Sequence, residues 1–212
     1  MRVVDLETWP RRHHFAKFNG FADPRFDMCV PVEVAPFRRA FKEQGLPLTA
    51  GIVYVITRSA NEIPEFRSRI RGDIVVEHEI VHPSLTILAT GDLFSFCHVD
   101  YQQDFALFAR DFVAQAGAVK AEPTLAEQPW RDDEFFMSAL PWVAFTAFHH
   151  PMPTIPADSI PRFAWGRVTA HGDEMAMPLE VQGHHALMDG LHLARFYEKA
   201  QAYFLQPESF LA

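Results

Sequence analysis

Cysteine is scarce in this sequence, which holds only Cys29 and Cys97 among its 212 residues. Two cysteines are too few for the disulfide framework that stabilises small secreted domains. Both lie in apolar, strand-like surroundings, where buried thiols are commonly inert, and no serine stands in a G-x-S-x-G motif. These absences count against a disulfide-rich secreted protein and against a nucleophilic serine or cysteine triad.

Concentrated positive charge is missing as well. The chain has 19 Lys and Arg against 27 Asp and Glu, a net charge of −8, and no basic cluster is longer than a pair such as Arg38 and Arg39. Nucleic-acid binding draws much of its affinity from a basic surface that displaces counterions from the phosphates. We therefore expect no nucleic-acid partner.

Long apolar runs are also absent. No stretch reaches the roughly 18 uninterrupted apolar residues that a membrane-spanning helix needs. The first residues lack the apolar core of a secretory signal and include Asp5 and Glu7. The sequence therefore predicts a cytoplasmic protein with no membrane partner.

Apolar and aromatic residues are abundant. Hydrophobic residues make up 49% of the chain, and its 20 Phe, 4 Trp and 4 Tyr make it 13% aromatic. Such a composition can supply a large core and still line an apolar pocket. No internal repeat and no Gly/Ser linker divides the chain. We expect one domain over residues 1–212, with proline-rich surface connections at 121–133 and 150–161.

Hydrophobic periodicity outlines the secondary structure. It predicts helices over residues 35–45, 48–60, 104–118 and 191–204. Strands are expected within 67–100 and over 135–138, 142–148, 163–171 and 175–182, the last two joined as a hairpin by a turn at 171–174. Helices and strands are mixed without strict alternation. This order predicts an α/β fold, an α+β two-layer sandwich whose mixed, largely antiparallel sheet is covered by helices.

The segment QGHHALMDGLH, residues 182–192, carries the clearest chemical signal because it joins a predicted strand to a predicted helix. A histidine held at such a strand end can take a proton from a hydroxyl near neutral pH. The pattern leaves alternatives open. The paired histidines could be incidental structure, or His185, Asp189 and His192 could offer the ligand types that zinc uses.

The same segment resembles the active-site signature of the chloramphenicol acetyltransferase family. That signature has a Gln two residues before a His pair, then HHxxxDG, then a further His, and the residues here are Gln182, His184, His185, Asp189, Gly190 and His192. HHxxxDG alone occurs in other acyltransferases too. Residues 9–15 (WPRRHHF), 65–67 (EFR) and 138–143 (SALPWV) also resemble stretches of this family. The resemblance therefore spans essentially all of the chain.

The resemblance implies an acetyl-CoA-dependent O-acetyltransferase with no metal. His185 is then the general base that takes the proton of an acceptor hydroxyl, whose oxygen attacks the thioester directly. Ser138 is the donor to the oxyanion of the tetrahedral intermediate. Asp189 pairs with Arg11 to hold the catalytic loop. The resemblance also implies a homotrimer whose active sites lie at subunit interfaces, with His185 facing the pocket of its neighbour.

The acceptor pocket is the part in which this sequence departs from the family pattern. The resemblance places five residues there: Phe18, Phe26, Phe94, His150 and Ala164. Phe18 replaces a tyrosine, Ala164 a threonine and His150 an apolar residue. Gly183 replaces the aliphatic residue before the His pair. The expected acceptor is chloramphenicol or a related small hydroxylated compound. The alternatives are an acyltransferase with a different acceptor and a non-catalytic, ligand-binding relative.

Overall fold

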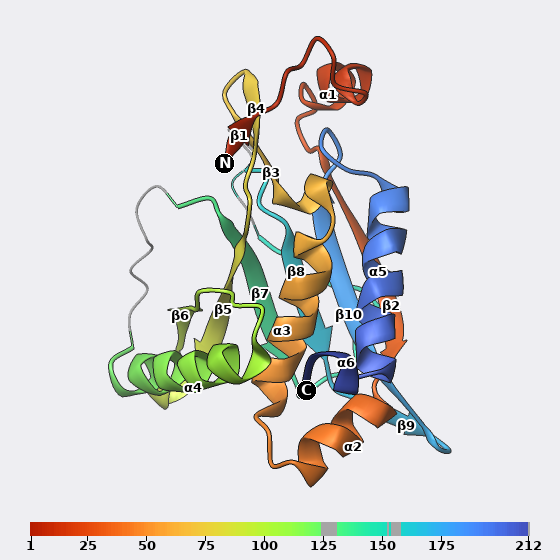
Figure 1. The fold of residues 1–212 in the computed structure, drawn as a ribbon. Coiled ribbons are helices and arrows are strands. Elements are labelled where there is room, and N and C mark those ends of the chain that lie inside the picture. The colour runs from red at the N-terminus through yellow and green to blue at the C-terminus, as the bar shows by residue number, and fades with distance from the viewer. Residues whose placement is uncertain (124–130, 152, 154–157, 212) are drawn as a thin grey trace.

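The computed structural model describes residues 1–123, 131–151, 153 and 158–211. Parts of the two predicted proline-rich connections, at 124–130, 152 and 154–157, lie outside the described residues. Figure 1 shows helices packed over one face of a central sheet, so that the described chain forms two layers. This arrangement confirms the predicted α/β fold.

The central sheet has seven strands in the order β2-β10-β8-β7-β5-β6, with β9 paired to β10. Neighbours β5 and β7, and β7 and β8, are parallel, whereas the other pairs are antiparallel. The strands are β2 (Arg25–Glu33), β5 (His82–Leu88), β6 (Phe94–His98), β7 (Glu134–Leu140), β8 (Arg162–Gly166), β9 (Thr169–His171) and β10 (Glu174–His184). The sheet is therefore mixed and largely antiparallel, as predicted.

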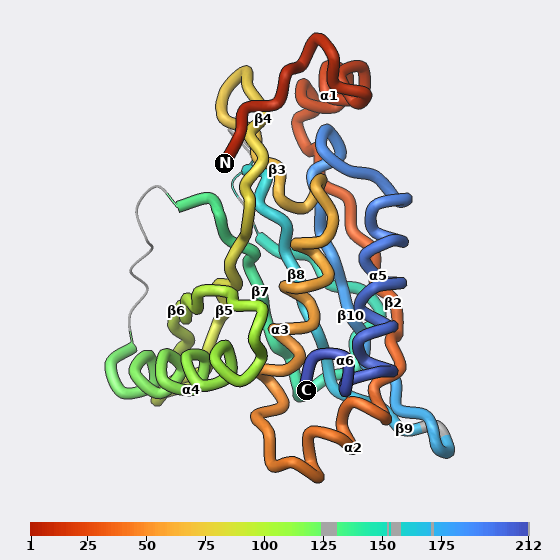
Figure 2. The backbone as a smooth tube through the Cα atoms, in the orientation of Figure 1, coloured from red at the N-terminus to blue at the C-terminus, as the bar shows by residue number. Residues whose placement is uncertain are grey.

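A smaller antiparallel sheet lies near the N-terminus and consists of β1 (Arg2–Val3), β4 (Ile74–Glu77) and β3 (Ser68–Arg71). Figure 2 shows the chain running from there to α1 (Arg12–Phe18), which lies beside the connection between β10 and α5. A small apolar cluster of Phe15, Val75, Ala186 and Leu187 joins these parts. The N-terminal segment thus supports the histidine-bearing connection.

The helical layer covers the apolar face of the central sheet. It contains α2 (Ala35–Glu43), α3 (Leu48–Asn61), α4 (Phe105–Ala121), α5 (Gly190–Leu205) and α6 (Glu208–Leu211), and two short 3-10 helices are η1 (Pro64–Arg67) and η2 (Thr90–Asp92). Ten of the 14 residues of α3 are buried, as expected for a helix that is apolar on all sides. Complete burial of a side chain such as Phe163 or Val181 contributes about 1.5–3 kcal/mol.

The opposite face of the sheet is polar. Alternation along β10 directs Leu179 and Val181 to the helices, so that Glu180 and Gln182 lie on the other face. The register between strands puts Ser138 of β7 on that polar face as well. Residues 141–150 cross the polar face as an irregular loop, and no helix covers it in the described part of the chain.

The structure corrects the strand prediction in several places. Residues 142–148 were expected to form a strand, but they lie in the irregular loop. An isolated hydrogen bond runs from the N–H of Arg167, the residue after β8, to the Val143 carbonyl (2.7 Å). Pro141 precedes this segment, and a proline cannot donate to a ladder. The predicted strand 163–171 is divided into β8 and β9. Strand β2 and helix α1 were not predicted.

Candidate active site

The connection between β10 and α5 holds its backbone in place through short-range hydrogen bonds. The ladder between β10 and β2 continues to the end of β10, where His184 pairs with Arg25. The N–H of His185 then donates to the Pro24 carbonyl (2.7 Å), and the N–H of Met188 donates to the His184 carbonyl (3.1 Å). The backbone on both sides of His185 is therefore fixed.

The imidazole of His185 is half-buried and fixed in orientation. Its Nδ1 lies 3.1 Å from the Met188 carbonyl oxygen. Because a carbonyl oxygen only accepts, this contact assigns the ring hydrogen to Nδ1 and leaves Nε2 with a free lone pair. The ring packs between aromatic neighbours, with centroid distances of 4.0 Å to Phe18 and 5.0 Å to Phe26. An imidazole held in this way can act as a base through Nε2.

Asp189 holds the start of α5. Its carboxylate accepts from the Leu191 N–H (3.1 Å) and pairs with the Arg11 guanidinium at 2.8 Å. Burial raises the pKa of Asp189, but the hydrogen bond from Arg11 and the charges of His192 and Arg11 outweigh that effect, so the net pKa is lowered. Asp189 is thus ionised near neutral pH. The predicted pairing of Arg11 with Asp189 is present.

The two remaining histidines of the signature have supporting positions. His184 is buried, its Nδ1 accepts from the Ala186 N–H at 3.3 Å, and burial lowers its pKa to about 4. It is therefore neutral at pH 7. His192 lies 2.9 Å from the Asp189 carboxylate and 3.4 Å from that of Glu65. Glu65, within the stretch 65–67, thereby links η1 to the histidine-bearing turn.

Ser138 lies far from His185 within one chain. Register places Ser138 beside Ala164, and Ala164 beside Glu180. Crossing two strand spacings covers about 10 Å, and the five residues from Glu180 to His185 add about 17 Å along the strand. The two predicted catalytic residues are therefore on the order of 20 Å apart in one chain.

The predicted pocket residues also fall into two groups, one beside His185 and one on strands distant from it. Phe18 and Phe26 touch the His185 ring, whereas Ala164 is fully buried on β8, near Ser138. Phe94 is 49% exposed on β6, five strand spacings from β2, or about 24 Å. One chain does not bring Phe26 and Phe94 into one small pocket, so their shared place in an acceptor pocket stays a prediction about a site between subunits.

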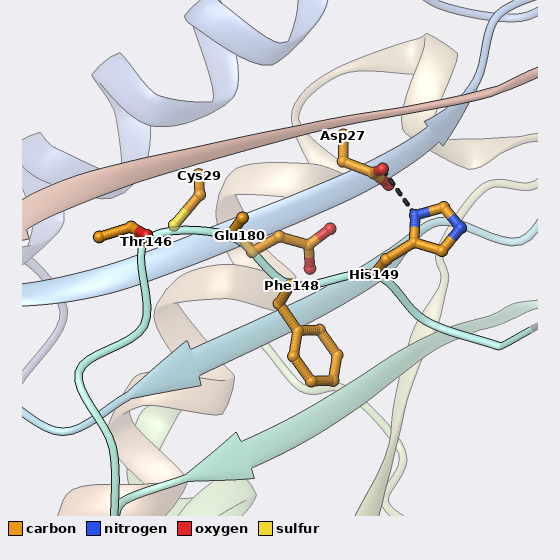
Figure 3. Close-up of a pocket in the computed structure, with 7 residues that line it drawn as sticks. Asp27, Cys29, Thr146, Phe148, His149 and Glu180 are labelled. Atoms are coloured by element: carbon orange, nitrogen blue, oxygen red, sulfur yellow. Dashed lines mark hydrogen bonds and ion pairs between the residues drawn. The ribbon is translucent and has the colours of Figure 1, made fainter.

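A cavity of about 470 Å³ lies between the polar sheet face and the irregular loop, and sequence reasoning missed it. Its lining, drawn in Figure 3, consists of Asp27, Cys29, Thr146, Ala147, Phe148, His149 and Glu180. Asp27 and His149 pair across it at 2.7 Å. The predicted pocket residue His150 is buried beside it, with its Nε2 3.3 Å from a Glu180 oxygen. A signal was available in the sequence, since Glu180 is a carboxylate between the apolar residues Leu179 and Val181 of a strand.

The zinc interpretation of the signature gains no support from the geometry. Within the described ranges, no group of three or more His, Cys, Asp or Glu side chains could hold a metal ion. His192 is engaged with Asp189 and Glu65, and His185 with the Met188 carbonyl. In the same part of the chain, no helix has both the length and the apolar character for crossing a membrane.

Solved structures share this architecture. A chloramphenicol acetyltransferase superposes with a TM-score of 0.84 and 26% identity, covering 96% of this chain and 99% of that one. The truncated catalytic core of a 2-oxoacid dehydrogenase multienzyme complex from Thermoplasma acidophilum has a TM-score of 0.69 at 11% identity, covering 98% and 99% of the two chains, and shares the fold alone. Together with the histidine-bearing turn, the first similarity defines an acyltransferase.

Sequence comparison then gives the family. The model of the chloramphenicol acetyltransferase family matches residues 1–201. The chloramphenicol acetyltransferase of Proteus mirabilis is 32% identical over 208 residues, which cover 95% of this chain and 93% of the relative. The chain belongs to the chloramphenicol acetyltransferase family, and it is an acyltransferase.

Proposed function

We propose that this acyltransferase moves the acetyl group of acetyl-CoA to the hydroxyl of a small acceptor, chloramphenicol or a related hydroxylated compound. The observation that carries the proposal is the His185 ring, whose Nδ1 faces the Met188 carbonyl at 3.1 Å while Nε2 keeps its lone pair. Nε2 takes the proton of the acceptor hydroxyl. The oxygen then attacks the thioester carbonyl carbon.

The remaining steps balance the proton and the charge. As the C–O bond forms, the carbonyl oxygen becomes an oxyanion, and the Ser138 hydroxyl donates a hydrogen bond to it. One such donor lowers the activation barrier by about 3–4 kcal/mol in comparable enzymes. The C–S bond then breaks, and the thiolate of CoA takes the proton from the imidazolium of His185. Asp189 and Arg11 hold the turn and take no part in the proton transfer.

The site is assembled, in this proposal, between subunits of a homotrimer. The separation of about 20 Å between Ser138 and His185 in one chain supports it, because one carbonyl carbon must be reached by both. Phe94, exposed and about 24 Å from Phe26, then lines the pocket from a neighbouring chain. The base and the oxyanion donor of one chain are thus too far apart on the sheet to belong to the same site, and they serve two different sites.

Thiol release from acetyl-CoA tests the proposal. Purified protein is assayed with and without chloramphenicol, beside His185→Ala and the control His14→Ala, an exposed histidine of α1. We expect acceptor-dependent release that falls about 10²–10⁴-fold in His185→Ala and is unchanged in the control. If only another hydroxylated acceptor is turned over, the proposed acetyl transfer stands and chloramphenicol is excluded as the acceptor. Unchanged turnover in His185→Ala contradicts the proposed base.

The proposed reaction is contradicted if no acceptor causes thiol release and calorimetry shows no binding of acetyl-CoA. That result would favour the non-catalytic, ligand-binding alternative. Binding of acetyl-CoA without turnover would leave the donor site intact and direct the search to other acceptors.

A further inference from the structure

Glu180 is a buried carboxyl group without a hydrogen bond. Its side chain is 0% exposed, and neither of its oxygens has a hydrogen-bond partner among the described residues. The imidazole of His150 lies close by, with its Nε2 3.3 Å from Oε2 of Glu180, but the two atoms do not form a hydrogen bond. Buried polar groups almost always have a hydrogen-bond partner, so we expect a bound molecule to supply the partner of this carboxyl.

Electrostatics around Glu180 agree with a missing cation. Burial, together with the negative charge of Asp27, raises the pKa of Glu180 to about 9. Burial, together with the charges of Arg162 and His149, lowers the pKa of His150 to about 4. Both groups are therefore neutral at pH 7. A cation placed between Glu180 and Asp27 would reverse the first shift and ionise Glu180.

The surroundings of this carboxyl have the form of a small-molecule site. Glu180 lines the cavity of about 470 Å³, within the usual size of ligand pockets, roughly 300–1,000 Å³. Figure 3 shows the carboxyl between the paired Asp27 and His149 and the ring of Phe148. Carboxylates and an aromatic ring are the groups that bind ammonium ions, through charge-assisted hydrogen bonds and cation–π contact.

We propose that this cavity binds a protonated amino group, so that the acceptor of this acyltransferase is an alcohol that also carries an ammonium group. This inference rests on the proposed function, because it assigns the class of acceptor. Glu180, Ala164 and Ser138 are register partners on one sheet face, which puts the Cα atoms of Glu180 and Ser138 about 10 Å apart. In the proposed pose the hydroxyl of the amino alcohol lies toward Ser138 and its ammonium toward Glu180, and the two side chains with their hydrogen bonds cover the rest of that distance.

A matched pair of acceptors tests the proposal. One is chloramphenicol, whose nitrogen is a neutral amide. The other is the free amine left when its dichloroacetyl group is removed, which has the same ring and hydroxyls. We expect the wild-type protein to favour the amine. The ratio of kcat/KM for the amine to kcat/KM for chloramphenicol should fall at least tenfold in Glu180→Gln, an isosteric change.

Two further variants make the result specific. Glu174→Gln removes the same charge from an exposed position at the start of β10, and it should leave the ratio unchanged. Asp27→Asn, on the exposed side of the cavity, should lower the ratio in the same direction as Glu180→Gln and keeps the test available if the buried variant does not fold. An unchanged ratio in folded Glu180→Gln would overturn the inference.

Binding of the amine without acetyl-CoA, measured by calorimetry, separates this inference from the proposed function. If His185→Ala abolishes turnover of both acceptors while Glu180→Gln leaves the ratio and the binding unchanged, the reaction stands and the ammonium site is wrong. If no acceptor is turned over but Glu180→Gln weakens binding of the amine at least tenfold, the site stands and the reaction is wrong.

Discussion

Gly183 shows how a single residue can support the candidate base. An added Cβ would lie 2.5 Å from the Met188 sulfur, 3.0 Å from its Cγ and 3.3 Å from the Phe26 ring. The space that an aliphatic side chain takes in the family pattern is filled here by Met188. Because the carbonyl of Met188 orients Nδ1 of His185, the fit around Gly183 also positions the imidazole.

Replacing Gly183 with alanine should therefore affect both stability and turnover. Gly183→Ala forces Met188 to shift in a fully packed site, at a cost of about 1–3 kcal/mol in the free energy of unfolding. We expect kcat to fall as well, because the Met188 carbonyl moves with its residue. Urea denaturation and thiol release measure the two effects.

The matched control is Gly117→Ala within α4, where an added Cβ meets nothing within 4 Å. Alanine in a helix interior is favoured over glycine by about 0.5–1 kcal/mol, so this variant should be slightly more stable and equally active. Equal stability of Gly183→Ala and the wild type would show that Met188 does not fill this space.

At the scale of elements, α5 begins with an unusually well-satisfied cap. Asp189 accepts from Leu191 N–H and pairs with Arg11, and its backbone N–H lies 3.1 Å from Nδ1 of His192. Helix starts leave backbone N–H groups without partners, so an aspartate cap stabilises them. In α5 the cap also carries the ion pair that links the start of α1 to the histidine-bearing turn.

Two substitutions at Asp189 separate the cap from the ion pair. Asp189→Asn keeps a capping oxygen and loses the charge, whereas Asp189→Ala loses both and leaves Arg11, 11% exposed, without its carboxylate. We expect a loss of about 1–3 kcal/mol for the alanine variant, with a smaller loss for asparagine. Both variants should show lower kcat, because Arg11 no longer holds the turn.

Asp104→Ala provides the comparison, since Asp104 caps α4 through Leu107 N–H (3.0 Å) and takes no part in the proposed site. It should lose about 1 kcal/mol with unchanged kcat. If Asp189→Asn retains full kcat, the ion pair serves stability alone and its role in positioning the turn is wrong.

The sequence predicted helices better than strands because their apolar stripes arise within the element itself. The boundaries of α2, α3, α4 and α5 agree with those predicted to within a few residues. Strand β2 was missed although Phe26, Met28, Val30 and Val32 alternate with more polar residues. Pro31 obscured that signal, yet a proline is tolerated because β2 is an edge strand. The error at 142–148 has the opposite cause, because an apolar segment can lie over a sheet without joining it.

At the scale of the whole molecule, sequence reasoning brought together the local part of the site and could not arrange the rest. Arg11 pairs with Asp189 as the resemblance implied, and this pair lies beside the turn that carries His185, because these positions depend on one turn and one neighbouring segment. Ser138 and Phe94 lie on other strands, and only the strand order shows how far they are from His185. The resemblance identified the candidate residues, whereas the strand order of the sheet determines which of them lie close together in one chain.

That separation leads to a prediction about mixed oligomers. His185→Ala and Ser138→Ala should each be nearly inactive, the second by about 10²–10³-fold. When the two variants are unfolded and refolded together, a site between chains can take Ser138 from one variant and His185 from the other. Random mixing in a closed symmetric ring restores about a quarter of the sites. Thiol release should therefore recover to about a quarter of the refolded wild-type activity, if each site is independent.

Each variant refolded by itself is the control and should stay inactive. A mixture that remains at the level of its two components, although sedimentation shows that the chains have exchanged, would place both residues in one chain's site. The strand spacing argues against that result, because about 20 Å exceeds the reach of a serine and a histidine to one carbonyl carbon. Recovery would show that each site uses residues of two chains. The distance between Ser138 and His185 on the sheet of one chain would then be the reason that catalysis needs the oligomer.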